Sequence, residues 1–297
     1  KRFIKNQRKS ELIIPMKYGL FSGGKKIRSK ILIDVGFLFN LNYKSLILIG
    51  SAIECIHAYS LIHDDLPCMD NDSLRRGKPS THIKFGESTA VLAGNSLLTM
   101  AFEILSHKDL KISEKNKINL INKISECSGH LGIAGGQYLD LNYEHKKISK
   151  KKIIEMEIKK TGKLFSFCCA VPLILKKKNN KEIKKFENIG ADIGLLFQVA
   201  DDLIDHKGNT LAAGKKTGKD SKKGKATLIS LLGYKNAIKY AHKLILKINL
   251  LAYLIVFLSP SKLIRVALPF FLSLPVFFPA TNKLPLLSIK SSATWNN

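Results

Sequence analysis

The sequence is sparing in several features that mark particular classes of protein. Its five cysteines among 297 residues are odd in number and lack the spacing of a metal site, which favours reduced thiols in a cytosol-like compartment. Hairpin signals and strand-like alternation are scarce, which disfavours an all-β fold. No signal peptide or long uninterrupted apolar span opens the chain, so we expect a cytoplasmic protein. Because the sequence begins at Lys1 rather than Met, we expect its N-terminus, with any targeting segment, to be incomplete.

Acidic residues are scarce too, since 23 Asp and Glu stand against 49 Lys and Arg, a formal net charge of +26. A strongly basic protein can bind nucleic acid by releasing counterions. The lysines are spread along the whole chain, however, and aromatic residues do not alternate with them as a stacking platform for bases requires. We therefore predict no nucleic-acid partner, and salt-dependent binding to DNA or anionic vesicles would contradict this.

The chain is rich in apolar residues that recur with the period of an α-helix. Hydrophobic residues make up 45% of it, enough for a substantial core, and their spacing follows a helix from about residue 45 to about residue 250. We predict an all-α fold with one domain over residues 1–246. Residues 247–297 form a separate apolar tail of different composition.

Two aspartate clusters interrupt otherwise apolar stretches. They are Asp64-Asp65-Leu66-Pro67-Cys68-Met69-Asp70 and Asp201-Asp202-Leu203-Ile204-Asp205. Ionised carboxylates are seldom buried without a positive partner, so six of them in apolar surroundings indicate hard cations bound through oxygen. Mg²⁺ fits this pattern best, and Mg²⁺ in turn indicates a phosphate-bearing substrate. The alternative is a pair of solvated acidic helix ends.

Helical geometry brings the carboxylates of the second cluster together. Asp201 and Asp205 are about 40° apart around a helix, close enough to share a metal or to hold neighbouring ones. In the first cluster Asp64 and Asp70 would point to different sides of a regular helix. Pro67 disrupts the helix between them and can re-aim Asp70.

Basic residues lie where a phosphate could use them in residues 23–28 (Gly-Gly-Lys-Lys-Ile-Arg), 75–77 (Arg-Arg-Gly) and 160–162 (Lys-Thr-Gly). Arg offers a planar fork for phosphate oxygens and Lys a compact point charge, so a diphosphate with its magnesium ions would find complementary charge here. A solvated basic face is the alternative for any one of these segments.

A lysine- and glycine-rich segment, residues 207–225, separates two predicted helices. Its seven lysines and four glycines are typical of a flap over an anionic substrate, with a disordered linker as the alternative. An ATP-binding P-loop does not fit. Gly218 and Gly224 are separated by five residues rather than four, and Ala226 replaces the hydroxyl residue that holds the metal.

With these motifs the sequence resembles the short-chain trans-prenyl diphosphate synthase family, and most closely its bacterial-type farnesyl diphosphate synthases. The resemblance rests on residues 54–67 (Glu-Cys-Ile-His-Ala-Tyr-Ser-Leu-Ile-His-Asp-Asp-Leu-Pro) through 75–77, and on residues 197–205. Residues 23–25, 135–140, 160–162 and 214–215 also occur in family order. The resemblance therefore covers roughly residues 15–245.

The resemblance implies an isoprenoid synthase-type helical bundle with a central cavity, usually in a homodimer, whose two aspartate motifs face each other across the cavity mouth. It implies condensation of isopentenyl diphosphate with dimethylallyl and geranyl diphosphate to give farnesyl diphosphate, by Mg²⁺-assisted ionisation, condensation and proton loss. A non-catalytic diphosphate-binding or partner subunit of the same family is an alternative. A geranyl or geranylgeranyl diphosphate synthase is another.

The resemblance also implies residue roles. Three Mg²⁺ ions would be held with the allylic diphosphate by Asp64, Asp65, Asp70, Asp201, Asp202 and Asp205. The allylic diphosphate would also contact Arg75, Lys160, Thr161, Gln198, Lys215 and Lys225. Isopentenyl diphosphate would contact Lys25, Arg28, His57 and Arg76, although His57 could instead be a packed core histidine. The residues expected to carry catalysis are Asp64, Asp65, Asp70, Asp201, Asp202 and Lys160.

Product length should depend on what lies beneath the aspartates. Tyr59 is five residues before Asp64, which on a helix places it about 7.5 Å further from the cavity mouth. It is predicted to floor the cavity. An aromatic residue there resembles the arrangement in bacterial C15 synthases, with an ordinary core tyrosine as the alternative.

The tail departs from the family. Its apolar stretches are broken by Pro260, Pro269, Pro275 and Pro279, which disfavours a membrane-spanning helix and leaves a peripheral membrane contact as an alternative. We favour a changed reading frame. It would leave the motifs intact but remove closing helices and basic residues, so the tail puts activity in question.

Overall fold

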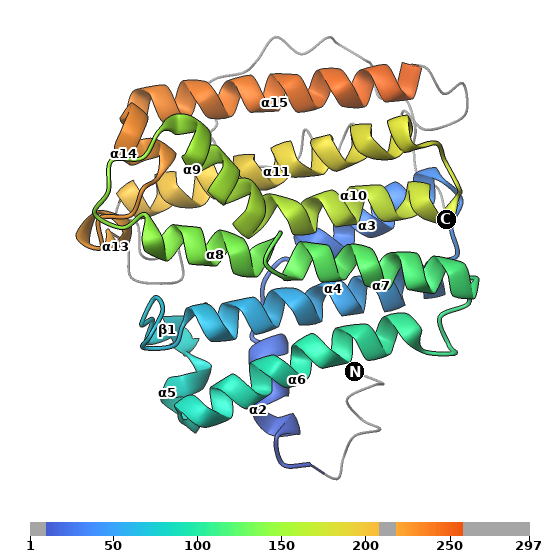
Figure 1. Ribbon diagram of the computed structural model, residues 1–297, viewed down its shortest axis with the longest axis horizontal. Helices are drawn as coiled ribbons and strands as arrows, with labels where there is room; N and C mark the ends of the chain where they lie inside the picture. Colours follow the sequence, from blue (N-terminus) through green and yellow to red (C-terminus); the bar gives the residue numbers. More distant parts are fainter. Residues whose placement is uncertain (1–9, 208–217, 258–297) are drawn as a thin grey trace, which may run out of the picture.

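The structure is a computed structural model that describes residues 10–207 and 218–257. Within these residues the fold is a helical bundle with one small hairpin, which confirms the predicted all-α class (Figure 1). The elements are α2 (Ile13–Leu20), α3 (Ile27–Leu38), α4 (Tyr43–Asp64), β1 (Leu74–Arg75), β2 (Lys78–Pro79), α5 (Thr81–Phe85), α6 (Glu87–Ser106), α7 (Glu114–Ser128), α8 (Ile133–Asn142), α9 (Lys150–Glu157), the π-helix η1 (Ile158–Gly162), α10 (Lys163–Leu175), α11 (Asn180–Lys207), α13 (Lys219–Lys222), α14 (Leu228–Leu232) and α15 (Tyr234–Phe257).

Helix α4 forms the centre of the bundle and packs mainly against α6 and α3. Its N-terminus is capped by Asn42, whose side chain accepts a hydrogen bond from the Ser45 backbone N–H at 3.2 Å. Leu46, Ile49 and Ile53 are fully buried, as the helical spacing of apolar residues predicts. By length and composition alone, α4 and α6 could each cross a membrane; 67% of the apolar window of α4 is buried in the bundle, and 44% of that of α6.

Helices α10 and α11 approach each other closely because small residues line their contact. A Cβ atom on Gly190 would lie 2.5 Å from the Ser166 Cα, and one on Gly194 would lie 2.5 Å from the Gly162 Cα. Side chains at these positions would force the helices apart. The close approach fixes the position of α11, which carries the second aspartate cluster, relative to η1.

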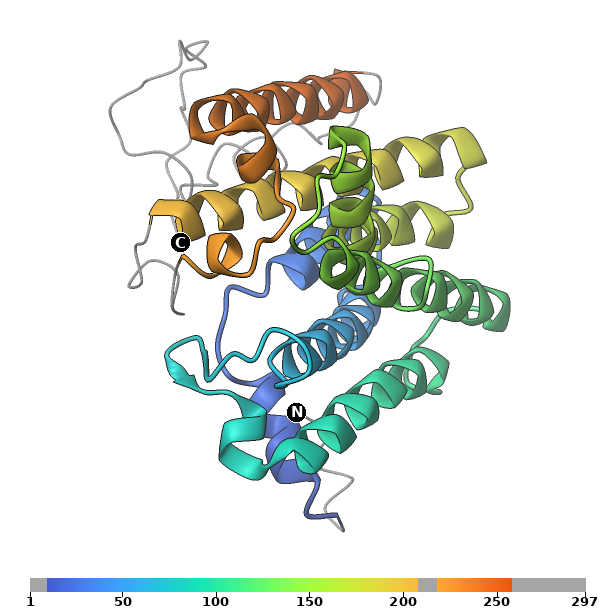
Figure 2. The same ribbon diagram turned by 60° about the vertical axis from the view of Figure 1, so that its left-hand side comes forward.

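Helix α15 covers the outer face of α11 (Figure 1). It runs without a break past residue 246, the predicted end of the main domain, to Phe257. The remainder of the predicted tail, residues 258–297, lies outside the described residues. Figures 1 and 2 place the C-terminal end of α4, the hairpin and α13 at the same end of the bundle, so both aspartate clusters lie at that end.

Candidate active site

The first aspartate cluster begins where α4 ends. Asp64 is the last residue of the helix, and the chain then turns back so that the Asp70 N–H donates to the Asp64 carbonyl at 2.8 Å. Pro67 lies in this turn, so the expected re-aiming of Asp70 is confirmed. Burial raises the pKa of Asp64 to about 6, against the opposing effect of Lys160.

Asp65 points to the other side of the motif and is buried against Arg75. Arg75 Nε lies 3.0 Å from Asp65 Oδ1 and its Nη2 also donates to that oxygen, while the Asp72 carboxylate lies 3.6 Å from Nη2. Such a forked ion pair holds the hairpin against the end of α4. The pair occupies mainly the Oδ1 atom of Asp65.

The second cluster lies near the C-terminal end of α11. Asp201 is exposed, whereas Asp202 and Asp205 are buried. Gln198 Nε2 donates to Asp202 Oδ1 at 2.8 Å, and the Gln198 Oε1 accepts a hydrogen bond from the Thr161 hydroxyl at 3.0 Å. The other oxygen of Asp202, Oδ2, is buried and has no hydrogen-bond partner among the described residues. A buried acceptor left open in this way is suited to a cation.

A π-helical turn presents the predicted Lys160 and Thr161 between the two clusters. The sequence indicated that residues 160–162 interrupt a helix, and η1 is that interruption. A Cβ on Gly136 would lie 2.2 Å from the Lys160 backbone nitrogen, so α8 packs directly on this turn. Single π-turns within α-helices occur frequently at functional sites.

Three charges of low exposure, those of Lys160, Asp140 and Lys225, form an ion-pair network on the first cluster. Lys160 Nζ lies 2.7 Å from Asp140 Oδ2, and Lys225 Nζ lies 3.3 Å from the same oxygen and 2.8 Å from Asp70 Oδ1. Although burial alone would raise it, these two lysines hold the pKa of Asp140 below its usual range. Burial alone would lower the pKa of Lys225, but Asp140 and Asp70 raise it, so it is protonated at neutral pH.

The residues predicted for isopentenyl diphosphate lie on α3, α4 and the hairpin. Arg28 Nη1 and His57 Nε2 are 3.2 Å apart, and the Arg28 guanidinium lies 4.6 Å from the centre of the Phe165 ring. Burial, and then Arg28, lower the pKa of His57 well below its usual value, so His57 is neutral at physiological pH. The neutral His57 ring can therefore accept a hydrogen bond from the charged Arg28 guanidinium.

Arg76 and Lys25 belong to the same side of the site. Arg76 donates to the Gly23 carbonyl and lies 3.2 Å from the Ser22 hydroxyl, which ties the hairpin to the loop before α3. Lys25 is exposed on that loop. Gly24 has φ +96°, and a Cβ there would lie 2.6 Å from Arg76 Cζ, so this position requires glycine.

Tyr59 is buried on α4 five residues before Asp64. Its hydroxyl lies 3.3 Å from the Ser128 carbonyl at the end of α7, and its ring packs edge-on against His63. Burial raises the pKa of the phenol to about 12. The side chain is therefore held between α4 and α7, and its role as the floor of a cavity stays a prediction.

Three site residues were not predicted from the sequence. Asp140 anchors two lysines, and only its place in the family-ordered residues 135–140 could have identified it. Lys223 contacts Asp70 but cannot be distinguished by sequence among the seven lysines of its segment. Glu157 is buried, and burial, then the nearby Asp202, raise its pKa well above its usual value. The predicted Lys215 lies outside the described residues.

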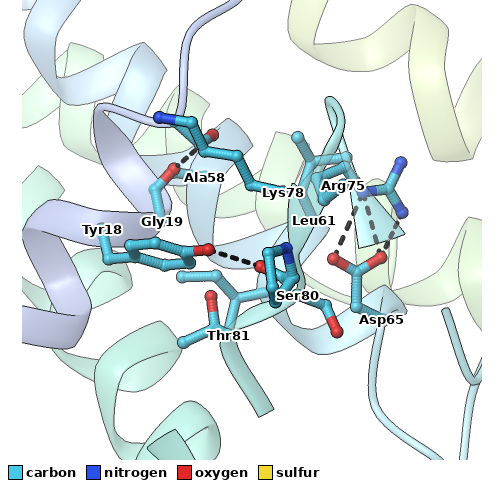
Figure 3. Close-up of a pocket in the computed structure, with 12 residues that line it drawn as sticks. Tyr18, Gly19, Ala58, Leu61, Asp65, Arg75, Lys78, Ser80 and Thr81 are labelled. Atoms are coloured by element: carbon cyan, nitrogen blue, oxygen red, sulfur yellow. Dashed lines mark hydrogen bonds and ion pairs between the residues drawn. The ribbon is translucent and has the colours of Figure 1, made fainter. Parts of the chain in front are cut away.

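A separate hollow lies behind the first cluster (Figure 3). Its volume is about 320 Å³, including space open to solvent, and it is lined by α2, the end of α4, the hairpin and α5. Tyr18 donates to the Pro79 carbonyl at 2.7 Å across one wall, and the Asp65–Arg75 pair forms another. The hollow thus lies between the hairpin and α2, and its lining does not include Lys160, Asp140 or Lys225.

The carboxylates fit Mg²⁺ only together with a substrate. Among the described residues no three His, Cys, Asp or Glu side chains are grouped closely enough to form a complete metal site. Mg²⁺ is commonly held by one or two carboxylates, with substrate phosphates and water as the other ligands. The open Asp202 oxygen and the partly exposed Asp64 carboxylate suit this arrangement.

Comparisons with known proteins agree with this geometry. The sequence is 41% identical over 232 residues to a farnesyl diphosphate synthase of Escherichia coli, covering 77% of this chain and 78% of that protein. A farnesyl diphosphate synthase of Bacillus subtilis is 40% identical over 230 residues, covering 77% of each. A geranyltransferase structure from Helicobacter pylori, complexed with magnesium and isoprenyl diphosphate, superposes with a TM-score of 0.79 at 32% identity, covering 91% of this chain and 93% of that one.

The sequence model of one family, polyprenyl synthetase, matches residues 9–249. This range contains both aspartate clusters, the π-turn and the lysines that join them. The chain therefore belongs to the polyprenyl synthetase family.

Proposed function

We propose that this chain is a farnesyl diphosphate synthase that condenses isopentenyl diphosphate first with dimethylallyl and then with geranyl diphosphate. The main support is the ion-pair network of Lys160, Asp140 and Lys225 with Asp70 of the first cluster, next to the Thr161–Gln198–Asp202 hydrogen bonds of the second. Prenyl transfer itself is the activity of its family relatives, and a transferase is the enzyme class that the relatives indicate. A non-catalytic subunit is not favoured, because both aspartate clusters are intact.

The allylic diphosphate would lie between the clusters. Lys160 and Lys225 would neutralise charge on it as the allylic C–O bond ionises, and their low exposure, 19% and 10%, strengthens this effect. Asp64, Asp70, Asp201 and Asp202 would hold Mg²⁺, which when bound supplies Lewis-acid stabilisation of the leaving diphosphate. Asp65 would act by fixing Arg75, and Asp205 by holding the segment after α11.

The carbocation that remains needs nearby oxygen atoms and no competing nucleophile. The Thr161 hydroxyl donates its proton to Gln198, so its lone pairs stay available to face positive charge. Isopentenyl diphosphate, bound through Lys25, Arg28, His57 and Arg76, would present its double bond to the cation. The released diphosphate would accept the proton that is lost, since Lys225 is already protonated and the lowered pKa of His57 makes its ring a weak base.

Tyr59 supports a C15 product. Its buried ring closes the space between α4 and α7 about 7.5 Å below Asp64, where a growing chain would end. The alternative products, geranyl and geranylgeranyl diphosphate, would require that limit to lie elsewhere.

An exposed apolar face supports a homodimer. Helix α6 is apolar enough to span a membrane by composition, yet only 44% of its apolar window is buried. Val91 and Leu92 are exposed on α6, and Ile83 is exposed on α5 beside it. A second copy of this chain would cover such a face. A cytoplasmic location is also proposed, supported by the five free cysteines.

The function is tested by incubating the purified chain with Mg²⁺, isopentenyl diphosphate and dimethylallyl diphosphate, followed by chromatography of the dephosphorylated products. Farnesol is the expected product. Absence of any prenyl product would refute the proposed prenyltransferase activity. Geranylgeraniol as the main product would refute only the proposed C15 chain length.

A further inference from the structure

The segment from Gly218 to Lys225, called here the lysine strap, connects the two aspartate clusters. At one end the Gly218 N–H donates to the Asp205 carbonyl at 3.1 Å, and the Asp220 N–H donates to Asp205 Oδ2 at 3.2 Å. At the other end Lys225 lies 2.8 Å from Asp70 Oδ1. The strap therefore crosses the mouth of the site from the second cluster to the first.

The strap ends in a turn that places a second lysine, Lys223, on the same aspartate. Lys223 Nζ donates to the Asp70 backbone carbonyl and lies 3.4 Å from Asp70 Oδ1. Gly224 adopts φ +60°, which favours glycine, and its carbonyl accepts a hydrogen bond from the His145 N–H at 2.8 Å. This fixed reversal directs Lys223 and Lys225 to one carboxylate.

The two lysines differ in how strongly they are held. Lys225 contacts two carboxylates, those of Asp70 and Asp140, and its side chain is 10% exposed. Lys223 contacts Asp70 alone among the described residues, and its side chain is 28% exposed. Two ammonium groups on one carboxylate leave an excess positive charge, and Lys223 is the group that an incoming anion can recruit most easily.

We propose that Lys223 is a further diphosphate-binding residue that closes the strap on Asp70 before substrate arrives and exchanges partners when substrate binds. In the exchange Asp70 gives up Lys223 and takes a metal ion, while Lys223 takes an oxygen of the allylic diphosphate. The proposal rests on the proposed function, since it deepens the role of the same site.

The exchange predicts a coupling between metal and diphosphate. A metal ion that binds alone must compete with Lys223 for the Asp70 carboxylate. When the diphosphate is also bound, Lys223 contacts the diphosphate and leaves Asp70 to the metal. By linkage, the metal ion and the diphosphate must then each raise the binding affinity for the other. Removal of the Lys223 ammonium should strengthen binding of metal alone and weaken binding of the diphosphate.

The test compares Lys223→Ala with the wild type and with Lys239→Ala, which removes the same charge from an exposed position on α15. Free Mn²⁺, used in place of Mg²⁺, is measured by electron paramagnetic resonance with and without a non-ionising thio analogue of dimethylallyl diphosphate. We expect Lys223→Ala to bind Mn²⁺ alone roughly three- to tenfold more tightly and the analogue with Mn²⁺ more weakly by a similar factor, as for a partly exposed ion pair. Lys239→Ala should match the wild type.

A purely structural role for Lys223 gives a different result. In that case Lys223→Ala would lower the melting temperature and weaken the binding both of Mn²⁺ alone and of the analogue with Mn²⁺. Lys223→Arg would then restore stability without restoring any metal–diphosphate coupling. Unchanged Mn²⁺ affinity in Lys223→Ala, or weakened Mn²⁺ binding, would refute the proposal. These measurements need no turnover, so they are independent of the test of function. The proposal for Lys223 can be refuted while the wild type makes farnesyl diphosphate. Conversely, the coupling can be observed while the wild type makes no prenyl product.

Discussion

Replacement of Asp140 by asparagine tests the charge network directly. Asp140 is 6% exposed and is shared by Lys160 at 2.7 Å and Lys225 at 3.3 Å. Breaking a buried ion pair by removing one partner typically costs about 3–5 kcal/mol. Lys225 keeps Asp70 as a partner, so we expect a loss of about 2–4 kcal/mol, or about 4–16 °C in Tm for a chain of this size.

Activity should fall as well, because the two lysines lose the group that sets their positions. A displacement of about 1 Å at a reacting centre can cost about 100-fold in rate, so we expect kcat to fall by about 10- to 100-fold. Thermal unfolding and steady-state kinetics at pH 7 measure both effects. Glu126→Gln, which removes one exposed acidic charge on α7, serves as the control and should change neither by much.

The pH dependence of Asp140→Asn gives the sharper test. The pKa of Asp140 in the folded chain is below its usual value, so its contribution to stability is complete above about pH 4 and is lost as the pH falls through the folded value. The difference in unfolding free energy between wild type and variant should therefore be constant at neutral pH and shrink below about pH 4. A variant that melts within about 1 °C of the wild type at pH 7 would refute the reasoning.

Three other substitutions test assigned roles. Asp201→Ala should lower turnover by about two or more orders of magnitude, since one carboxylate for Mg²⁺ is lost, while circular dichroism shows an intact fold; normal turnover at saturating Mg²⁺ would contradict the metal assignment. Arg76→Ala should raise the KM for isopentenyl diphosphate selectively, and equal effects on both substrates would contradict the division between them. Tyr59→Ala should give products longer than C15, provided that melting shows the variant to survive the roughly 3–5 kcal/mol cost of an aromatic truncation; a folded, active variant that still stops at C15 would place the limit elsewhere.

The sequence predicted those features that depend on neighbouring residues in the chain. Apolar spacing predicted the helices, Pro67 predicted that the helix is disrupted before Asp70, and the break at residues 160–162 predicted a discontinuity that the structure shows as a π-turn. Each of these needs only local geometry.

Features that depend on distant contacts could not be predicted from local patterns. Asp140 meets Lys225 across 85 residues, and Lys223 meets Asp70 across 153. The forked pair of Asp65 with Arg75 likewise gives the second aspartate of the motif a partner that residue type and spacing do not indicate. Nothing in these residues' sequence neighbourhoods distinguishes them from solvated charges, because their partners are set only when the helices pack.

The π-turn at η1 makes the chain unusually sensitive to a change in length at one point. A π-turn holds one more residue than the α-turn it replaces, so α9 and α10 are rotated relative to each other compared with one continuous α-helix. Loss of one uncharged residue of this turn, such as Ile158, would restore regular α-helical hydrogen bonding there. It would also turn one flanking helix by about 100° relative to the other and carry Lys160 away from Asp140. An in-frame deletion of one codon here should therefore abolish activity even though it leaves every charged side chain of the site in the sequence.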